Sequence, residues 1–359
     1  MKQKAIVFGK GNYYEKKKES IKEKYEIESF LDNAVKPGSV EEKDGVKVYN
    51  PQNVDYYMGD AKILLASNKW FEMWKQLMKL GIDEKRIVFG AELFPFVDMI
   101  EEIFHDEHIT IRTREKELFL QNAEEEKVSE EAEFKAVVRK LFAKKNPYIK
   151  LISDMPCRPV SKRFGQERGT PIDRFYIERF LAAHRKYIKG TVMEIAEKRY
   201  IKMFSEDVSE AIILHVNGWG EGVMKGNLAT GEGIEADRVD CMICTQTIQF
   251  IYDIHNVVKN VYKLLKPGGM VMLTASAISQ ISLYDYKNWG EYWRFTDQSM
   301  KKLLAEVFEE SQIEVYSYGN MKAAMAFMFG VCQEEMNLAD LEYYDEQFPM
   351  IIAAIARKV

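Results

Sequence analysis

Short apolar runs alternate with charged, amphipathic stretches along the first hundred residues. Runs of this length read as buried strands, and the stretches between them have the charge or the apolar spacing of surface helices. Gly81 ends the second helical stretch, as a glycine does after a last turn. This alternation favours a parallel, doubly wound sheet, so we predict an N-terminal Rossmann-like domain over residues 1–105. The expected strands are 4–9, 46–50, 61–67 and 85–90, and the expected helices are 16–27 and 68–81.

Residues 106–165 have a different pattern. The run ITIRTREKELFLQN (109–122) alternates polar and apolar residues, as a two-stranded ribbon does. A helix should follow, because Phe134 and Leu141 belong to an apolar stripe, and it cannot continue through Pro147. The acidic run at 123–133 reads as a solvated face. We predict a small connecting module of ribbon and helix.

The alternation returns, with stronger apolar runs, over residues 166–359. An amphipathic helix opened by Pro171 and closed by Gly190 precedes the first strand, and Thr296 can cap a later helix. We therefore predict an α/β protein with two Rossmann-like, doubly wound domains, the second over residues 166–359. The expected strands of this domain are 191–196, 210–216, 237–245, 270–276, 313–319 and 348–359, with a K-P-G-G turn at 266–269.

Composition narrows the class of protein. The 359 residues are 47% hydrophobic and 30% charged, which excludes wholesale disorder. The net charge of -5 argues against nucleic acid as the main partner. No apolar run approaches the ~18–20 residues of a membrane span, and the N-terminus lacks the apolar stretch of a secretory signal. We expect a cytoplasmic protein without membrane insertion.

The cysteines invite a metal or redox interpretation that the pattern disfavours. Cys241 and Cys244 form a C-x-x-C, but they lie in an expected strand, where residues three apart point to opposite faces. His105 and His108 have no evident third ligand. We therefore expect buried packing at the cysteines and no metal site.

The order of elements after residue 166 carries a resemblance. Strand, helix and strand precede LLKPGGMVMLTA, and this order resembles the class I methyltransferase fold, which binds S-adenosylmethionine. The runs RGTPIDRFYIERFL, CTQTIQFIYDI, ISQIS and NWGEYWRFT are similar to a bacterial group found among sugar and surface-glycan biosynthesis proteins, some with an N-terminal Rossmann-like domain. The resemblance implies methyl transfer to a sugar or a glycosylated small molecule. It does not identify the acceptor atom, and we expect O-methylation of a sugar, a nucleotide-sugar or a glycosylated small molecule.

The resemblance also assigns cofactor-binding positions. Glu194 fits the acidic residue at the end of the first strand, and Ala196 stands where the family usually has glycine. Asn217 and Asn227 stand where a carboxylate is usual, so a non-catalytic binding or scaffold protein stays open as the alternative. The expected cofactor-binding residues are Glu194, Ala196, Tyr200, Asn217, Asn227, Thr245 and Gln246.

The acceptor side is expected around SQISLYDYKNWGEYWRFT (279–296). A hydroxyl acceptor loses a proton, so a nearby base can help, and His215 and Asp285 are the candidate catalytic residues. His215 can also be a packed histidine, and the aromatic cluster can also be a lid or part of the core. Aromatic faces suit a sugar ring and a guanidinium suits phosphate. The expected substrate-binding residues are Tyr284, Trp289, Tyr292 and Arg294.

The N-terminal domain offers a weaker signal. Gly9-Lys10-Gly11 follows the first strand, but the third glycine of a dinucleotide turn is replaced by Tyr14. A nucleotide-sugar-binding protein acting through this domain is a further alternative, and a homo-oligomer stays open.

Overall fold

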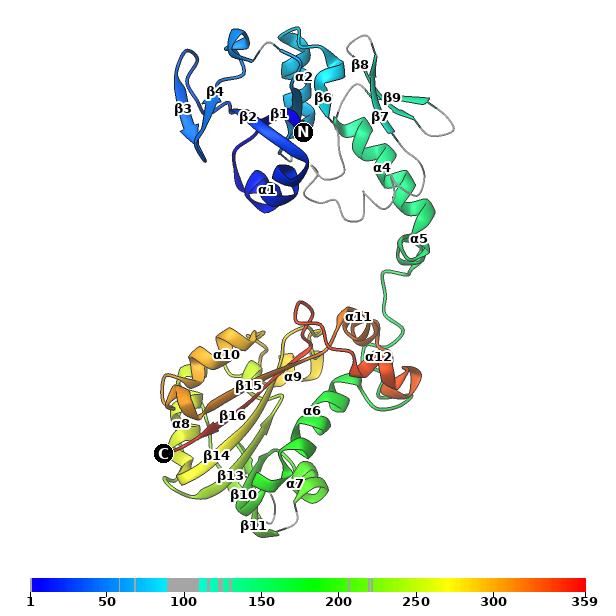
Figure 1. Cartoon of the computed structure of the whole chain (residues 1–359). Coiled ribbons are helices and arrows are strands. Elements are labelled where there is room, and N and C mark those ends of the chain that lie inside the picture. Colours follow the sequence, from blue (N-terminus) through cyan, green and yellow to red (C-terminus); the bar gives the residue numbers. More distant parts are fainter. Residues whose placement is uncertain are drawn as a thin grey trace. The chain divides into compact units, whose positions relative to one another are not determined.

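The computed structural model describes residues 2–88 and 110–359, apart from positions 58, 68, 115, 116, 122–124, 129, 130, 206, 219 and 221. The chain divides into two compact units, residues 1–155 and 156–359 (Figure 1). The expected boundary at residue 105 lies outside the described residues. The α/β class is confirmed, because both units carry helices and a largely parallel sheet.

The first unit contains a six-stranded sheet in the order β3-β4-β2-β1-β5-β6. All neighbours are parallel except β3 and β4. Apolar side chains of α1, such as Tyr14 and Ile21, are buried on one face, and those of α2, such as Trp74 and Leu77, on the other. The elements are β1 (Gln3–Phe8), α1 (Asn12–Lys24), β2 (Tyr25–Leu31), β3 (Val40–Lys43), β4 (Val46–Tyr49), β5 (Lys62–Leu65), α2 (Trp70–Lys79) and β6 (Ile87–Val88).

Strand β2 corrects the expected helix at 16–27. The helix ends at Lys24, and residues from Tyr25 onward pair in parallel with β1. The charged residues at the start of β2 resemble the surface of a helix, although Phe30 and Leu31 at its end are fully buried. Pairing and burial therefore override the local helical composition.

A three-stranded antiparallel sheet and two helices complete the first unit. The ribbon expected at 109–122 is present as β7 (Thr110–Arg114) and β8 (Glu117–Gln121). A third strand, β9 (Glu125–Val128), pairs with β8 inside the acidic run. Helix α4 (Glu131–Lys145) places Phe134 against Trp70 of α2, with ring centroids 4.9 Å apart, and α5 (Pro147–Asp154) follows.

The second unit contains a seven-stranded sheet in the order β12-β11-β10-β13-β14-β16-β15. Its first five strands are parallel, and β16 runs antiparallel between β14 and β15. The strands are β10 (Lys189–Ile195), β11 (Asp207–His215), β12 (Val223–Lys225), β13 (Val239–Thr245), β14 (Leu265–Ser276), β15 (Ile313–Tyr318) and β16 (Ile351–Arg357).

Helices cover both faces of this sheet (Figure 1). One core contains side chains of α6 (Ile172–Ala183), α7 (Arg199–Phe204), α11 (Met321–Phe329) and α12 (Leu338–Glu342). The opposite core contains side chains of α8 (Ile254–Leu264) and α10 (Asp297–Leu304). The chain builds β10, β11 and β12 in one direction and then crosses to β13 on the other side of β10. Strand order therefore reverses between β10 and β13, and a crevice opens at such a point, outside the carboxyl ends of the strands.

Two local expectations in this unit are corrected. Helix α6 ends at Ala183, and Gly190 lies inside β10 with φ of 71°. A Cβ on Gly190 would come within 2.6 Å of Asp240 Oδ2, so the glycine admits a close strand contact. The K-P-G-G residues lie inside the span of β14, where they leave the ladder between Leu265 and Met270.

Other local expectations are confirmed. The Thr296 hydroxyl accepts the Ser299 N–H at the start of α10. Cys241 and Cys244 are fully buried in the two opposite cores, and burial raises the pKa of each thiol to about 12. Their packing role follows from this placement.

No helix in the described part of the chain is long and apolar enough to cross a membrane. Among the described residues, no three His, Cys, Asp or Glu side chains form a group that could hold a metal ion. His105 and His108 lie outside these residues.

Candidate active site

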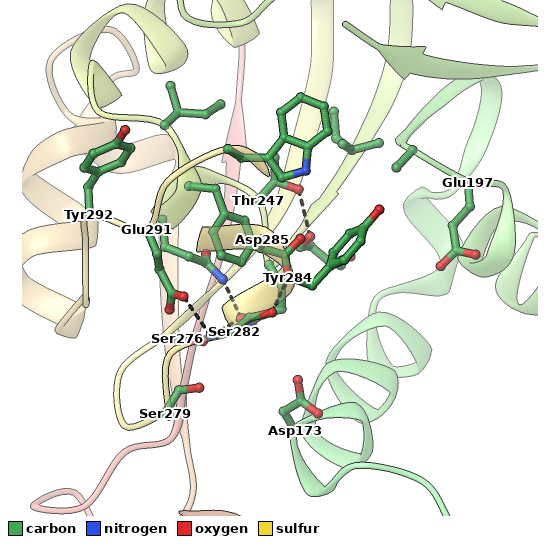
Figure 2. Close-up of a pocket in the computed structure, with 18 of the residues that line it drawn as sticks. Asp173, Glu197, Thr247, Ser276, Ser279, Ser282, Tyr284, Asp285, Glu291 and Tyr292 are labelled. Carbon is green, nitrogen blue, oxygen red and sulfur yellow. Dashed lines mark hydrogen bonds between the residues drawn. The ribbon is translucent and has the colours of Figure 1, made fainter. Parts of the chain in front are cut away.

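A cavity of about 1360 Å³ lies at the carboxyl ends of the central strands of the second unit. Its position matches the point where the strand order reverses. The strand ends β10, β11, β13 and β14 contribute the polar wall residues Glu194, His215, Thr245, Gln246 and Ser276. The loop after β14 and the start of α6 form further walls (Figure 2).

Ala196 takes the backbone conformation that the missing glycine would take. Its φ is 65°, and the Glu197 N–H donates to the Ile195 carbonyl across it at 2.8 Å. Such a three-residue turn with positive φ is rare and strained for a residue with a Cβ. The backbone at Ala196 therefore has a conformation that suits glycine, and the alanine adopts it at the cost of strain.

Glu194 fixes the turn onto the next helix. Its side chain is 2% exposed, and its carboxylate accepts the backbone N–H groups of Tyr200 at 3.0 Å and Ile201 at 2.9 Å. Burial raises the pKa of Glu194, and these two hydrogen bonds act against the rise. Tyr200 is buried away from the cavity wall, where its hydroxyl accepts from Arg174 at 2.7 Å.

His215, at the end of β11, and Asn227, after β12, line one side of the cavity. The Asn227 side-chain oxygen accepts the Ala229 N–H at 2.8 Å, which leaves its amide donors uncommitted in the described structure. The Asn217 side chain is exposed and does not line the cavity. Five of the seven expected cofactor residues therefore meet at one cavity, and Tyr200 and Asn217 do not.

Gln246 carries both strain and unused hydrogen-bonding capacity. Its φ is 46°, and its side-chain oxygen accepts from Ser276 Oγ at 2.6 Å and from Gln249 Nε2 at 2.8 Å. Gln246 Nε2 and Gln249 Oε1 are buried without a partner. An unpaired buried polar group costs ~1–3 kcal/mol, so a ligand that pairs with these atoms gains by doing so.

Backbone strain concentrates at this cavity. Five non-glycine residues in the described chain have positive φ, and Phe164, Ala196 and Gln246 line the cavity. Such conformations cost of order 1–3 kcal/mol each and cluster at functional sites. Their placement favours a binding or catalytic role for the cavity.

The acceptor side is formed by the loop after β14 and by α9 (Leu283–Asn288). The Ser282 hydroxyl donates to Asp285 Oδ2 at 2.6 Å, and the Ser282 N–H donates to Glu291 at 2.9 Å (Figure 2). The aromatic wall residues are 45% to 75% exposed, which excludes a core cluster. These residues are Tyr284, Trp289 and Tyr292.

His215 is oriented by a backbone donor. The Asn217 N–H donates to Nδ1 at 3.1 Å, so the proton of the neutral ring is assigned to Nε2. The ring meets Trp289 edge to face, with centroids 6.3 Å apart. In this tautomer the Nε2–H of His215 is a hydrogen-bond donor.

Arg294 lies behind the acceptor loop. Its guanidinium pairs with Glu291 at 2.5 Å and donates to the Trp293 carbonyl at 2.9 Å, and it does not line the cavity. Since the Glu291 side chain is only 5% exposed, this ion pair holds the loop in place.

Asp173 is a wall residue that the sequence did not single out. It occupies the first turn of α6 on a different wall from Asp285 (Figure 2). Its Oδ1 is inaccessible and has no partner, and burial raises its pKa, with Arg174 acting against the rise. An aspartate at a helix start is ordinary in a sequence, so only a folded cavity reveals this one.

Asp173→Asn is expected to raise the free energy of unfolding by about 1–3 kcal/mol at neutral pH, because it removes an underpaired buried carboxylate. An acid whose folded pKa is raised binds its proton more tightly in the folded state. Wild-type stability should therefore fall as pH rises from the ordinary value of 3.8 through the folded pKa. Urea unfolding across pH measures this. The exposed Asp207→Asn variant is the control, and equal pH profiles for wild type and Asp173→Asn would contradict the expectation.

A close packing contact explains the glycine at position 9 in the first unit. Gly9 has φ of 107°, and a Cβ there would come within 2.6 Å of the Ala66 carbonyl oxygen. Lys10 pairs with Glu41 at 2.5 Å. These contacts account for Gly9 and Lys10 without a phosphate.

Comparison with known proteins bears on both units. Residues 1–88 match the family described as C2185-like, N-terminal. Residues 189–273 match the family described as Methyltransferase domain. Over 91 residues the chain is 23% identical to the probable polyketide synthase 10 of Dictyostelium discoideum, a match that covers 25% of this chain and only 4% of that protein.

Solved structures give distant matches. N-methyltransferase NodS from Bradyrhizobium japonicum, in complex with S-adenosyl-L-homocysteine, is 11% identical, covering 55% of this chain and 93% of its own, with a TM-score of 0.36. A SAM-dependent methyltransferase from Archaeoglobus fulgidus is 13% identical, covering 52% and 94%, with a TM-score of 0.34.

The sequence match falls on the strands that build one wall of the cavity. It begins at the start of β10 and ends within β14, and it includes Glu194, Ala196 and Gln246. Residues 189–273 therefore match a methyltransferase domain, and they include the strand ends that line one wall of the cavity.

Proposed function

We propose that the protein transfers a methyl group from S-adenosylmethionine to a hydroxyl of a sugar, a nucleotide-sugar or a glycosylated small molecule. The observation that carries the proposal is one cavity with two different walls. One wall is made by the strand ends with Ala196 and Gln246, and the other by the exposed aromatic loop with Asp285. A cofactor and an acceptor bound to these walls would share one space.

The cofactor wall fits an elongated polar ligand. The left-handed turn at Ala196 brings backbone close to the cavity, and Gln246 Nε2 and Gln249 Oε1 are buried and unpaired. Asn227 adds amide donors. Glu194 supports this wall from behind through the backbone of α7. S-adenosylmethionine, when bound, supplies an activated methyl group, so the protein's main task is alignment.

The acceptor wall supplies the proton chemistry. Asp285 Oδ2 is held by the Ser282 hydroxyl, which leaves Oδ1 to accept a proton from the acceptor hydroxyl. His215 Nε2–H is oriented as a donor toward a ligand oxygen. Tyr284, Trp289 and Tyr292 offer exposed faces for a sugar ring.

Calorimetry with S-adenosylmethionine and S-adenosylhomocysteine tests the function. Saturable binding of both to the full chain is expected, and Tm should rise with ligand concentration. A failure of both ligands to bind at millimolar concentration would favour a non-catalytic protein that kept the fold. The strain at Ala196 and the exposed Asn217 are the observations behind that second candidate.

A further inference from the structure

Helix α6 supplies a wall of the cavity from outside the matched methyltransferase domain. The family match begins at residue 189, whereas α6 ends at Ala183. Asp173 and Arg174, in the first turn of α6, both line the cavity. Figure 2 shows the Asp173 carboxylate pointing from this helix into the cavity. The family match therefore assigns no role to a charged wall of the site.

The carboxylates that line the cavity differ in how they are satisfied. They are Asp173, Glu194, Glu197, Asp285 and Glu291. Three have partners, because Glu194 accepts backbone N–H groups, Asp285 accepts a serine hydroxyl and Glu291 pairs with an arginine. Glu197 is exposed to solvent. Asp173 Oδ1 is inaccessible and has no partner, so it costs free energy until a donor reaches it.

The neighbouring cation does not supply that donor. Arg174 Nη1 donates to the Tyr200 hydroxyl at 2.7 Å, and within the described chain Arg174 forms no ion pair with Asp173. Burial raises the pKa of Asp173 more than the charge and the backbone N–H of Arg174 lower it. A ligand that enters the cavity can therefore supply the missing donor.

The first turn of α6 is linked to the turn at Ala196. The Tyr200 hydroxyl, which accepts from Arg174, belongs to α7, and the Tyr200 N–H donates to Glu194 at 3.0 Å. Glu194 stands two residues before Ala196 in the chain. These two contacts connect α6 to the end of β10, so Asp173 lies on the side of the cavity where the cofactor wall begins.

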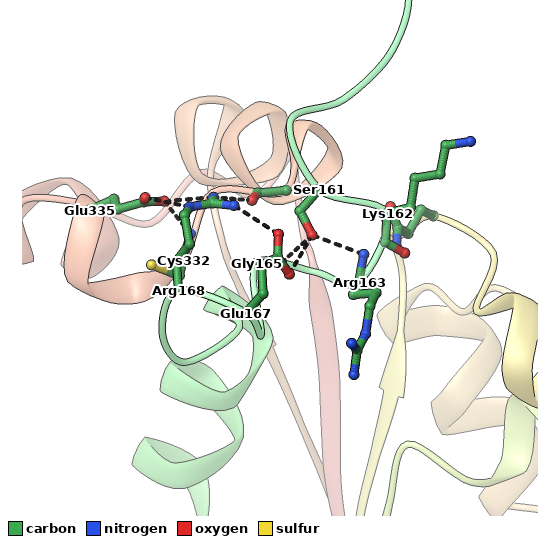
Figure 3. Close-up of polar contacts among 10 residues, drawn as sticks. Ser161, Lys162, Arg163, Gly165, Glu167, Arg168, Cys332 and Glu335 are labelled. Carbon is green, nitrogen blue, oxygen red and sulfur yellow. Dashed lines mark hydrogen bonds and ion pairs between the residues drawn. The ribbon is translucent and has the colours of Figure 1, made fainter.

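Polar contacts fix the segment that leads into α6 (Figure 3). Arg168 donates to both carboxylate oxygens of Glu335, at 2.7 and 3.0 Å. Thr170 donates to Glu334 through its N–H and its hydroxyl, both at 2.8 Å. Paired contacts of this kind fix orientation as well as distance. Since Asp173 follows closely in the chain, its position is set before a ligand binds, which lowers the entropic cost of binding.

We propose that Asp173 binds the α-ammonium group of S-adenosylmethionine. The inference rests on the proposed function and adds a residue that holds the amino-acid end of the cofactor. An ammonium group carries a positive charge and N–H donors, so it can satisfy Oδ1 with a charge-assisted hydrogen bond. The sulfonium is also cationic, but it has no N–H to donate. Glu197 is the other candidate on this side, but an exposed carboxylate gains less from pairing because water already solvates it.

Calorimetry on the full chain with two ligands tests the assignment. One ligand is S-adenosylhomocysteine, and the other is its deamino analogue, in which a hydrogen replaces the amino group. The wild-type protein should bind S-adenosylhomocysteine about tenfold more tightly than the analogue. Asp173→Asn should weaken S-adenosylhomocysteine binding about tenfold and should not weaken binding of the analogue. A structural effect of the substitution would lower both affinities, so the comparison isolates the ammonium contact.

The matched control is an aspartate in the first turn of another helix. Asp297→Asn lies in α10, away from the cavity, and should bind both ligands as the wild type does. Equal wild-type affinities for the two ligands, or equal losses of both in Asp173→Asn, would overturn the assignment. A preference for the amino group that survives in Asp173→Asn but disappears in Glu197→Gln would overturn it in favour of Glu197. If the wild type binds neither ligand, the proposed function itself fails and the assignment falls with it.

Discussion

Asp285→Asn is expected to lower kcat by about 10²–10⁴-fold, because an amide cannot take the proton of the acceptor hydroxyl. The substitution keeps the shape of the side chain and can keep the Ser282 hydrogen bond, since the amide oxygen can accept at 2.6 Å as Oδ2 does. The loss should therefore appear in kcat rather than in the affinity for S-adenosylhomocysteine. The measurement is the rate of S-adenosylhomocysteine formation with an acceptor that the wild-type protein methylates.

The control is an aspartate in the first turn of a neighbouring helix. Asp297 starts α10 and does not line the cavity, so Asp297→Asn should retain wild-type kcat. An Asp285→Asn variant with wild-type kcat would rule out the base.

Ala196→Val is expected to weaken S-adenosylhomocysteine binding about a hundredfold, or ~2.7 kcal/mol. A β-branched residue fits poorly at φ of 65°, so the turn must move and carry the cavity wall with it. Ala196→Gly should bind at least as tightly as the wild type, because glycine adopts this conformation without strain. Calorimetry with the three proteins measures the order.

The pair separates the turn from general damage to the fold. If both substitutions weaken binding equally, the conformation at position 196 is not what matters. If neither changes binding, the cofactor wall is wrongly placed. Thermal unfolding of each variant checks that the second unit stays folded.

The strands of the second unit are easier to predict from sequence than those of the first, for a physical reason. Its central strands are buried on both faces, so runs such as residues 241–244 are continuously apolar and can be recognised from sequence alone. Strands β2 and β9 carry charged residues and depend on a neighbour for their structure. Local composition alone does not indicate a strand there, and only the pairing reveals it.

The residues of the candidate site also fall into two groups, those that the strand order predicts and those that it does not. Positions at strand ends, such as Glu194 and Gln246, follow from the order of the strands, because parallel strands end at one edge. Asp173 belongs to a helix start, where a charged residue is ordinary. Arg294 is the opposite case. Its guanidinium stands out in the sequence, but in the structure it is paired with Glu291 and does not line the cavity. The run RFGQERG holds two glycines with close neighbours: Gly165 lies against the backbone of Cys332 and Gly330, and Gly169 against the side chains of Glu334 and Cys332.

The position of strand β16 affects the order in which the sheet can assemble during synthesis. It is the last of the seven strands to be synthesised, yet it lies inside the sheet, with β14 on one side and β15 on the other. Strand β15 has no other partner in the sheet order. On the ribosome, β10 to β14 can therefore associate early, while β15 waits for residues 351–357 to emerge. During that interval the edge of β14 that β16 later covers is exposed to pairing with other chains.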